Sequence, residues 1–119
     1  LGCCRLQWVE LEMSLDYYQK FLEAANGIKY TWDNLMKVSE RVWNLTRLFL
    51  IREHNDFGRH FDYPPPRAYE EAVQNGPTAG SQAKKVDIDQ LLDEYYQLRG
   101  WDNNGKPTPE KLRELNLAP

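Results

Sequence analysis

Cys3 and Cys4 are the two side chains of this sequence that could bind a soft metal or form a disulfide. They are adjacent, and neighbouring cysteines rarely form a structural disulfide because the ring strains the peptide between them. A secreted, disulfide-stabilised scaffold would have more cysteines at wider spacing. From spacing alone, we interpret both residues as ordinary thiols near the end of the chain.

The remaining candidates for chemistry give weaker signals. His54 and His60 lie on either side of Asp56, but the spacing matches no H-E-x-x-H or C-x-x-C pattern, so we expect no metal site there. Residues 102–105, Asp-Asn-Asn-Gly, lack the ligand spacing and the bidentate Glu of a calcium loop, and we interpret them as a turn. A Gly-rich phosphate loop, a Ser/His/Asp set and paired acid–base carboxylates are absent, so no catalytic residue is assigned.

Polar residues gather on one flank of the longest predicted helix, where Glu40, Asn44 and Arg47 fall close together and Arg41 lies beside them. This flank is either a face exposed to solvent or an ion-pair network that docks onto another domain, because guanidinium groups suit carboxylates across interfaces. The pattern favours the solvated face. Trp43 on the same flank weakens that preference, since an exposed Trp beside Arg is typical of an interface anchor.

Composition restricts the class of protein. The length of 119 residues suits a single domain, residues 1–119, and a hydrophobic share of 41% is enough for a core. The net charge of -3 and the lack of a basic stripe argue against nucleic-acid binding. No apolar stretch reaches the ~20 residues that span a bilayer, and no signal peptide is visible, so we expect no membrane partner and a cytoplasmic protein.

Two helices are predicted in the first half of the chain. Ser14 is placed to cap the first helix, and Asn26-Gly27 is placed to end it. Thr31 is placed to cap a second helix that runs from about Trp32 to about Arg52. Its apolar positions recur at intervals of three and four, and we expect them at the centre of the core: Leu35, Val38, Val42, Leu45 and Phe49. Leu45→Ala is then expected to cost ~2–5 kcal/mol.

Periodicity is lost from Asn55 to Lys85, where a run of prolines prevents a continuous helix. A long irregular segment of this kind often wraps over another surface. Beyond it, Asp87 and Gln90 predict a capping box at the start of a helix that Gly100 ends, and Thr108-Pro109 predicts the start of the last helix. We therefore assign an all-α fold: a small helical domain of about four helices with a proline-containing irregular segment in the middle.

Several motifs resemble, in their order and approximate distances, the C-terminal region of the tungsten-containing aldehyde ferredoxin oxidoreductases. Together they cover most of the chain at uneven strength. They are R-x-x-N-L-x-R-L-F at residues 41–49, a basic and acidic pattern ending in D-x-x-P-x-R at 59–67, G-P-x-x-G at 76–80, and LDEYYQLRGW at 92–101.

The resemblance also gives a chemical role to the start of the chain. In the family, a D-x-x-G-L-C segment contacts a pterin through its Asp and ligates a 4Fe–4S cluster through its Cys. Gly2 and Cys4 match that Gly and Cys, Cys3 stands where Leu is usual, and the Asp would precede Leu1. The resemblance therefore implies that Cys4 is the fourth cluster ligand and that Gly2 belongs to the pterin-proximal segment. The other three ligands, in a C-x-x-C-x-x-x-C run, would lie upstream.

The activity that the resemblance implies is oxidation of aldehydes to carboxylic acids, with tungsten held by two pterins and a 4Fe–4S cluster that passes electrons to ferredoxin. The chain would be a fragment that helps upstream domains of the same enzyme to enclose the cofactor and substrate channel. Alone, we expect it to be inactive, to bind no cofactor, and either to form a homo-oligomer or to have mobile loops. The alternative is a cofactor-free helical module that binds a partner protein.

Overall fold

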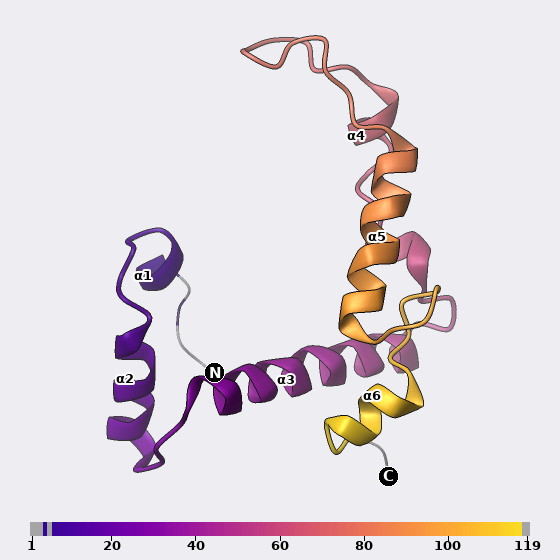
Figure 1. Cartoon of the computed structure of the whole chain (residues 1–119). Coiled ribbons are helices and arrows are strands. Elements are labelled where there is room, and N and C mark those ends of the chain that lie inside the picture. Colours follow the sequence, from indigo (N-terminus) through magenta and orange to yellow (C-terminus); the bar gives the residue numbers. More distant parts are fainter. Residues whose placement is uncertain (1–3, 5, 118–119) are drawn as a thin grey trace. The chain divides into compact units, whose positions relative to one another are not determined.

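The computed structural model describes residue 4 and residues 6–117. The predicted all-α class is confirmed: within that range there is no strand, and an isolated antiparallel bridge joins Trp101 to Pro107. None of the helices in the described range is long and apolar enough to cross a membrane. The elements, shown in Figure 1, are α1 (Leu6–Val9), α2 (Asp16–Asn26), α3 (Trp32–Glu53), the 3-10 helix η1 (Arg59–Asp62), α4 (Arg67–Glu70), α5 (Lys85–Arg99) and α6 (Pro109–Glu114).

Three predicted helix ends are confirmed by hydrogen bonds at the caps. Gly27 ends α2 with φ 73°, and its N–H donates to the carbonyl of Glu23 over 2.8 Å. The Thr31 hydroxyl oxygen accepts from the backbone N–H of Asn34 over 3.2 Å at the start of α3. Thr108 caps α6 in the same way, with Pro109 as its first residue. These ends form where predicted because each depends on adjacent residues.

The predicted start of α5 is wrong. The helix begins at Lys85, two residues before Asp87, and its N-cap residue Lys84 makes no side-chain capping hydrogen bond. The carbonyl of Lys84 accepts from the backbone N–H groups of Asp87 and Ile88, at 3.1 and 3.2 Å. Asp87 therefore lies inside the first turn, where its side chain cannot act as the cap. The end at Gly100, with φ 66°, is as predicted.

The irregular segment between α3 and α5 is held by turns. Besides η1 and α4, it contains a chain reversal in which Val73 N–H donates to Ser81 O over 2.9 Å and Gly80 N–H donates to Val73 O over 2.8 Å. A further bond of 3.2 Å, from Ala83 N–H to Ala68 O, ties this reversal to α4. Figure 1 shows the reversal as the loop that joins α4 to α5.

The chain divides into two compact units, Leu1–Trp43 and Asn44–Pro119, so that α3 contributes its first half to one and its second half to the other. The first unit contains α1 and α2, and the second contains η1, α4, α5 and α6. The buried apolar side chains of the second unit include Tyr96, Trp101 and Leu115. The assignment of a single domain stays a prediction.

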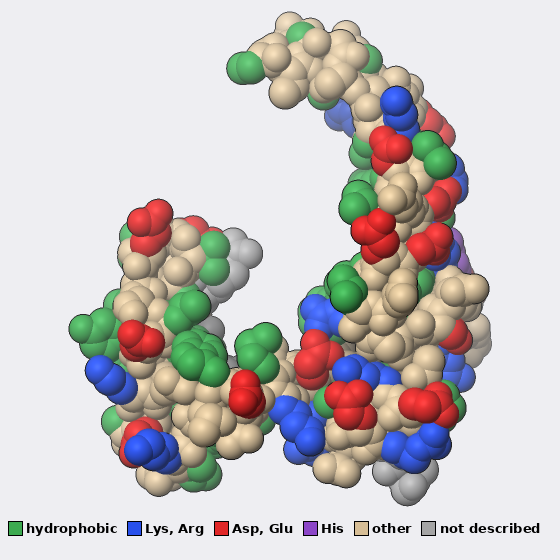
Figure 2. All heavy atoms as spheres, in the orientation of Figure 1, with side chains coloured by type: hydrophobic (Ala, Val, Ile, Leu, Met, Phe, Trp, Pro, Cys, Tyr) green, Lys and Arg blue, Asp and Glu red, His purple; other side chains and the backbone are tan. Residues whose placement is uncertain are grey.

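The predicted core face of α3 is wrong over most of its length. Leu35 is buried, but Val42, Phe49 and Leu45 are exposed, and Leu45 is 57% exposed. In the second unit α3 instead buries its polar flank, because nearby segments supply partners for polar side chains there. Leu45→Ala is therefore not expected to create a core cavity. Figure 2 shows hydrophobic side chains at the surface of both units.

Candidate functional site

Cys4 is the candidate site residue that the structure describes, and its thiol is exposed and free. Gly2 and Cys3 lie outside the described residues. Within the described range, no three His, Cys, Asp or Glu side chains lie close enough together to hold a metal ion. A thiolate is a suitable ligand for iron, so Cys4 fits as one ligand of a cluster. The described residues do not supply the four thiolates that a 4Fe–4S cluster needs. The ligand role of Cys4 stays a prediction.

The other candidates found by spacing are accounted for by local structure. Asp102 uses its carboxylate to accept hydrogen bonds from the backbone N–H groups of Asn104 and Lys106, both at 2.9 Å. This is the turn that the sequence predicts, and the carboxylate is occupied by the backbone. His60 lies 3.8 Å from the Asp56 carboxylate at the surface, and His54 is also exposed.

Arg47 is at the centre of a polar network whose partners come from distant parts of the same chain. Its Nη1 and Nη2 donate to the two carboxylate oxygens of Asp62 at 2.7 and 2.5 Å, and its Nε donates to the carbonyl of Gly105 at 2.8 Å. The guanidinium carbon lies 4.6 Å from the ring centroid of Phe57 and 4.7 Å from that of Trp101. A flat, delocalised cation suits a forked pair between aromatic rings. The side chain therefore joins α3, η1 and the turn after α5.

Asn44 and Trp101 make a second buried link between α3 and that turn. The indole Nε1–H donates to Asn44 Oδ1 over 2.8 Å, and Asn44 has no exposed surface. Gly105 completes the packing, because a Cβ built there would overlap the Arg47 guanidinium and the Tyr96 hydroxyl. Its φ of +77° is also a conformation that side chains other than glycine disfavour.

Asp62 is held in its charged form. Burial raises the pKa of this carboxyl, but hydrogen bonds from Arg47 and Tyr96, together with the charges of Arg47 and Arg59, lower it further than burial raises it. The net pKa lies below the usual value. Tyr96 donates its hydroxyl hydrogen to Asp62 Oδ2 over 2.5 Å. Burial and that hydrogen bond raise the pKa of Tyr96, so its hydroxyl stays protonated.

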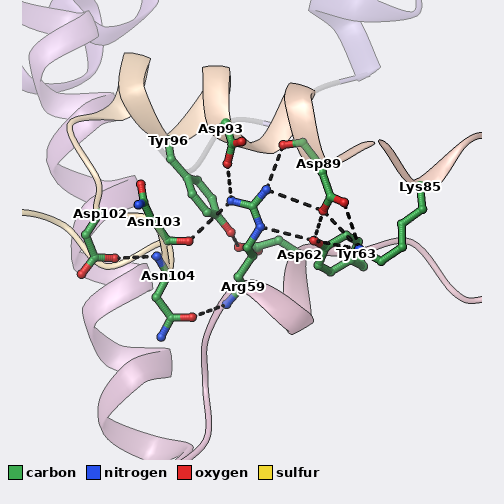
Figure 3. Close-up of polar contacts among 10 residues, drawn as sticks. All are labelled: Arg59, Asp62, Tyr63, Lys85, Asp89, Asp93, Tyr96, Asp102, Asn103 and Asn104. Atoms are coloured by element: carbon green, nitrogen blue, oxygen red, sulfur yellow. Dashed lines mark hydrogen bonds and ion pairs between the residues drawn. The ribbon is translucent and has the colours of Figure 1, made fainter. Parts of the chain in front are cut away.

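Arg59 forms the more exposed part of the network and joins η1 to α5 (Figure 3). Its Nη1 donates to the Asp93 carboxylate at 2.6 Å, and its Nη2 donates to the carbonyl of Asp89 at 2.8 Å. The Asp89 side chain in turn accepts from the Tyr63 hydroxyl and from the Lys85 ammonium group. Figure 3 shows these side chains pointing toward one another between the two elements.

The network can position elements of the fold, and its central carboxyl and phenol groups are committed to each other and to Arg47. Asp62 is charged and accepts at both oxygens, and Tyr96 is neutral and committed to it. No buried side-chain nitrogen or oxygen of the described residues lacks a hydrogen-bond partner. The prediction of a solvated flank is wrong for Asn44 and Arg47, and the carboxylate that pairs with Arg47 lies in the same chain.

Comparison with known proteins decides the family. A sequence model described as "Aldehyde ferredoxin oxidoreductase, domains 2 & 3" matches residues 1–117. The chain belongs to the aldehyde ferredoxin oxidoreductase family. It is similar to the tungsten-containing aldehyde ferredoxin oxidoreductases of Pyrococcus furiosus, with 39% identity over 89% of the chain, and of Pyrococcus horikoshii, with 37% identity over 88%. The chain spans 17% of the length of each relative.

A relative named for a different activity shares the same region. The aliphatic sulfonate oxidoreductase, WOR-like subunit, of Pyrococcus furiosus is 31% identical over 85% of the chain, which again spans 17% of that relative. Proteins that are similar to this chain are therefore named for different substrates, aldehydes in one case and aliphatic sulfonates in another.

Three of the four motifs that carried the resemblance to aldehyde ferredoxin oxidoreductases meet in the network around Arg47. Residues 41–49 supply Asn44 and Arg47, residues 59–67 supply Arg59 and Asp62, and residues 92–101 supply Tyr96 and Trp101. The resemblance to one family was the feature of the sequence that could have indicated that these residues contact one another. Their spacing on each helix gave no such indication, because their partners are distant in sequence.

Proposed function

We propose that this chain acts as the C-terminal domain of a cytoplasmic tungstopterin, iron–sulfur aldehyde ferredoxin oxidoreductase, where it helps to enclose the cofactor and the substrate channel. The observation that carries the proposal is the family match over residues 1–117. In the proposed reaction, one aldehyde and one water give a carboxylic acid, two protons and two electrons, and the electrons leave through a 4Fe–4S cluster to ferredoxin. When bound, the tungsten bis-pterin supplies the oxidation chemistry.

The surface of the chain supports a role as one part of a larger enzyme. Large apolar side chains are exposed on α3, and the most exposed one on α5, Leu98, is 85% exposed. Extended exposed apolar surface is characteristic of an interface. Upstream domains of the same enzyme are the partners we propose for it. Without them, the same surface favours self-association of the chain into a homo-oligomer.

Cys4 is the residue that we propose as the fourth ligand of the cluster, next to a pterin-proximal segment that includes Gly2. The support is the match of Gly2 and Cys4 to the family's G-L-C segment, together with the exposed, unpaired thiol of Cys4. The other three thiolates would come from upstream sequence. The buried network then has a structural task, which is to fix η1, α5 and the turn after it against α3.

The gene that encodes this sequence provides the first test. We expect a C-x-x-C-x-x-x-C run upstream of Leu1 in the same reading frame. The encoded enzyme, produced with tungstate and iron, should contain both metals by elemental analysis and reduce ferredoxin in the presence of an aldehyde. A stop codon or an unrelated domain directly upstream would instead favour the cofactor-free interaction module.

Adjacent cysteines allow a matched test of the ligand in that enzyme. Cys4→Ala should lower the iron content and alter the electron paramagnetic resonance signal of the cluster. Cys3→Ala removes the neighbouring thiol and should leave both unchanged. Equal effects of the two substitutions would contradict the assignment. For the chain alone, one thiolate is too few, so we expect no stoichiometric iron or tungsten after purification, and finding either would argue against the proposal.

A further inference from the structure

The thiol of Cys4 lies at the edge of an apolar hollow. The hollow has a volume of about 380 Å³, and its other described lining residues are Gln7, Trp8, Met13 and Phe21. Gln7 is the polar member of that group, and Trp8 is half-buried. Met13, Phe21 and Cys4 itself are exposed, so a group bound at the sulfur would contact apolar side chains on one side.

Backbone hydrogen bonds fix the turn between Trp8 and Met13. The chain turns back after α1, with Leu11 N–H donating to Leu6 O over 3.0 Å and Met13 N–H donating to Gln7 O over 2.9 Å. Glu12 adopts a φ of 51°, which lets the chain reverse within a few residues. The turn therefore places Met13 beside the helix that carries Trp8.

Aromatic contacts join the same wall to α2. The ring centroid of Trp8 lies 4.7 Å from that of Tyr18 in an edge-on arrangement, and 6.2 Å from that of Phe21. Tyr17 stacks on Phe21 at 5.8 Å. Helix α1 has four residues and buries none of them. These ring contacts, and not a deep core, hold Trp8 against α2.

We propose that Trp8, with Met13 and Phe21 beside it, forms an apolar wall over the iron–sulfur cluster that Cys4 ligates, and that this wall keeps the cluster's reduction potential low and protects the cluster from solvent and oxygen. The proposal rests on the proposed function, since it requires Cys4 to be a cluster ligand. Side chains of this chain would then adjust the reduction potential of the cluster, in addition to the thiolate that binds it.

The physical basis is the charge of the reduced site. A 4Fe–4S cluster with four thiolate ligands gains one negative charge when it takes up one electron. Water and polar groups stabilise that extra charge, and an apolar wall withholds them, so shielding shifts the potential to more negative values. Opening the wall must shift the potential upward. It must also let oxygen and water reach the iron sooner.

The test uses the full enzyme with two substitutions that open the wall in different ways. Trp8→Ala removes the largest ring, and Met13→Ser adds a hydroxyl without disturbing the ring contacts of Trp8. Trp32→Ala is the matched control, because Trp32 lies at the start of α3 and is not among the described lining residues. Iron content, the midpoint potential from a redox titration followed by paramagnetic resonance, and the rate of cluster loss in air are measured for each.

We expect Trp8→Ala and Met13→Ser to retain iron, to raise the midpoint potential and to speed cluster loss several-fold, while Trp32→Ala matches the unaltered enzyme. If Trp8→Ala fails to load iron, Met13→Ser decides the result. Unchanged potential and lifetime in an iron-replete Met13→Ser enzyme would overturn the wall and leave the proposed function intact. An unaltered enzyme with no cluster, or a cluster unaffected by Cys4→Ala, would overturn the ligand assignment and the wall with it.

Discussion

The indole N–H of Trp101 donates a 2.8 Å hydrogen bond to Oδ1 of Asn44, and both side chains are buried. The two residues are 57 positions apart in the sequence. The bond joins the middle of α3 to the turn that follows α5. A polar pair in this position ties two distant segments together at a defined register, and it costs free energy if either partner is lost.

Asn44→Leu should therefore destabilise the chain by about 1–3 kcal/mol, because the buried Trp101 N–H loses its acceptor. Leu45→Ala, at the next position, should change the free energy of unfolding by no more than about 0.5 kcal/mol, because Leu45 is an exposed side chain. Urea denaturation of both variants measures the difference. A larger loss of unfolding free energy in Leu45→Ala than in Asn44→Leu would instead indicate that the apolar face of α3 is buried.

Arg47→Met tests the buried pair with Asp62. We expect a loss of about 3 kcal/mol, because the substitution leaves the Asp62 carboxylate without its forked partner. Arg52→Met on the same helix is the control. The Arg52 side chain is 71% exposed and pairs with Glu53, so its loss should be below about 1 kcal/mol. Similar losses in the two variants would show that the network contributes no more than a surface ion pair.

The lowered pKa of Asp62 predicts a dependence of stability on pH. The folded chain keeps this carboxyl ionised at pH values where the unfolded chain, with an ordinary pKa of about 3.9, binds a proton. The stabilisation is thus complete above about pH 5 and is lost as the pH falls through the folded-state pKa.

Asp62→Asn should accordingly be less stable than the unaltered chain near neutral pH, and the gap should narrow as the pH falls. Denaturation midpoints measured across the acidic range give this gap directly. A gap of constant size at every pH would mean that the carboxylate contributes through packing and not through its charge.

Gly105→Ala tests the close approach of backbone to the network. A methyl group there would overlap the Arg47 guanidinium in addition to occupying a left-handed conformation. Gly27→Ala is a matched control, with φ +73° against +77° but with open space around the added carbon. The control should cost about 1 kcal/mol from backbone strain, and Gly105→Ala a further 1–3 kcal/mol from overlap. Equal melting temperatures for the two variants would show that overlap with Arg47 does not contribute to the loss of stability.

Several helix ends were predictable from the sequence because local chemistry determines them. The predicted cap at Ser14 is wrong, because α2 begins at Asp16 with Leu15 as its N-cap residue and without a side-chain capping hydrogen bond. Thr31 and Thr108 accept hydrogen bonds from backbone groups three residues ahead, and Gly100 supplies a left-handed residue. Asp87 shows the limit of the same reasoning. Its residue type suits a cap, but the helix begins two residues earlier, where the carbonyl of Lys84 accepts the first hydrogen bonds.

The buried face of α3 was not predictable from periodicity. An amphipathic pattern identifies an apolar face, but it does not say whether this chain or another covers it. Arg47 is buried because Asp62 and the Gly105 carbonyl neutralise and bind it, and those partners lie far along the chain. The ligand role proposed for Cys4 likewise came from the family resemblance, since the spacing of two adjacent cysteines indicated only ordinary thiols.

Three of the motifs lie together around Arg47 and Asp62, although they are far apart in the sequence. A pattern built from these three motifs would also match related sequences that have no cysteine at the position of Cys4. On the ligand role proposed for Cys4, aligning such sequences on the Arg47 region and asking whether a cysteine occupies that position would separate candidate cluster-binding proteins from those that lack this ligand. The residues around Arg47 would thus align the sequences, and the residue aligned with Cys4 would indicate whether the proposed ligand is present.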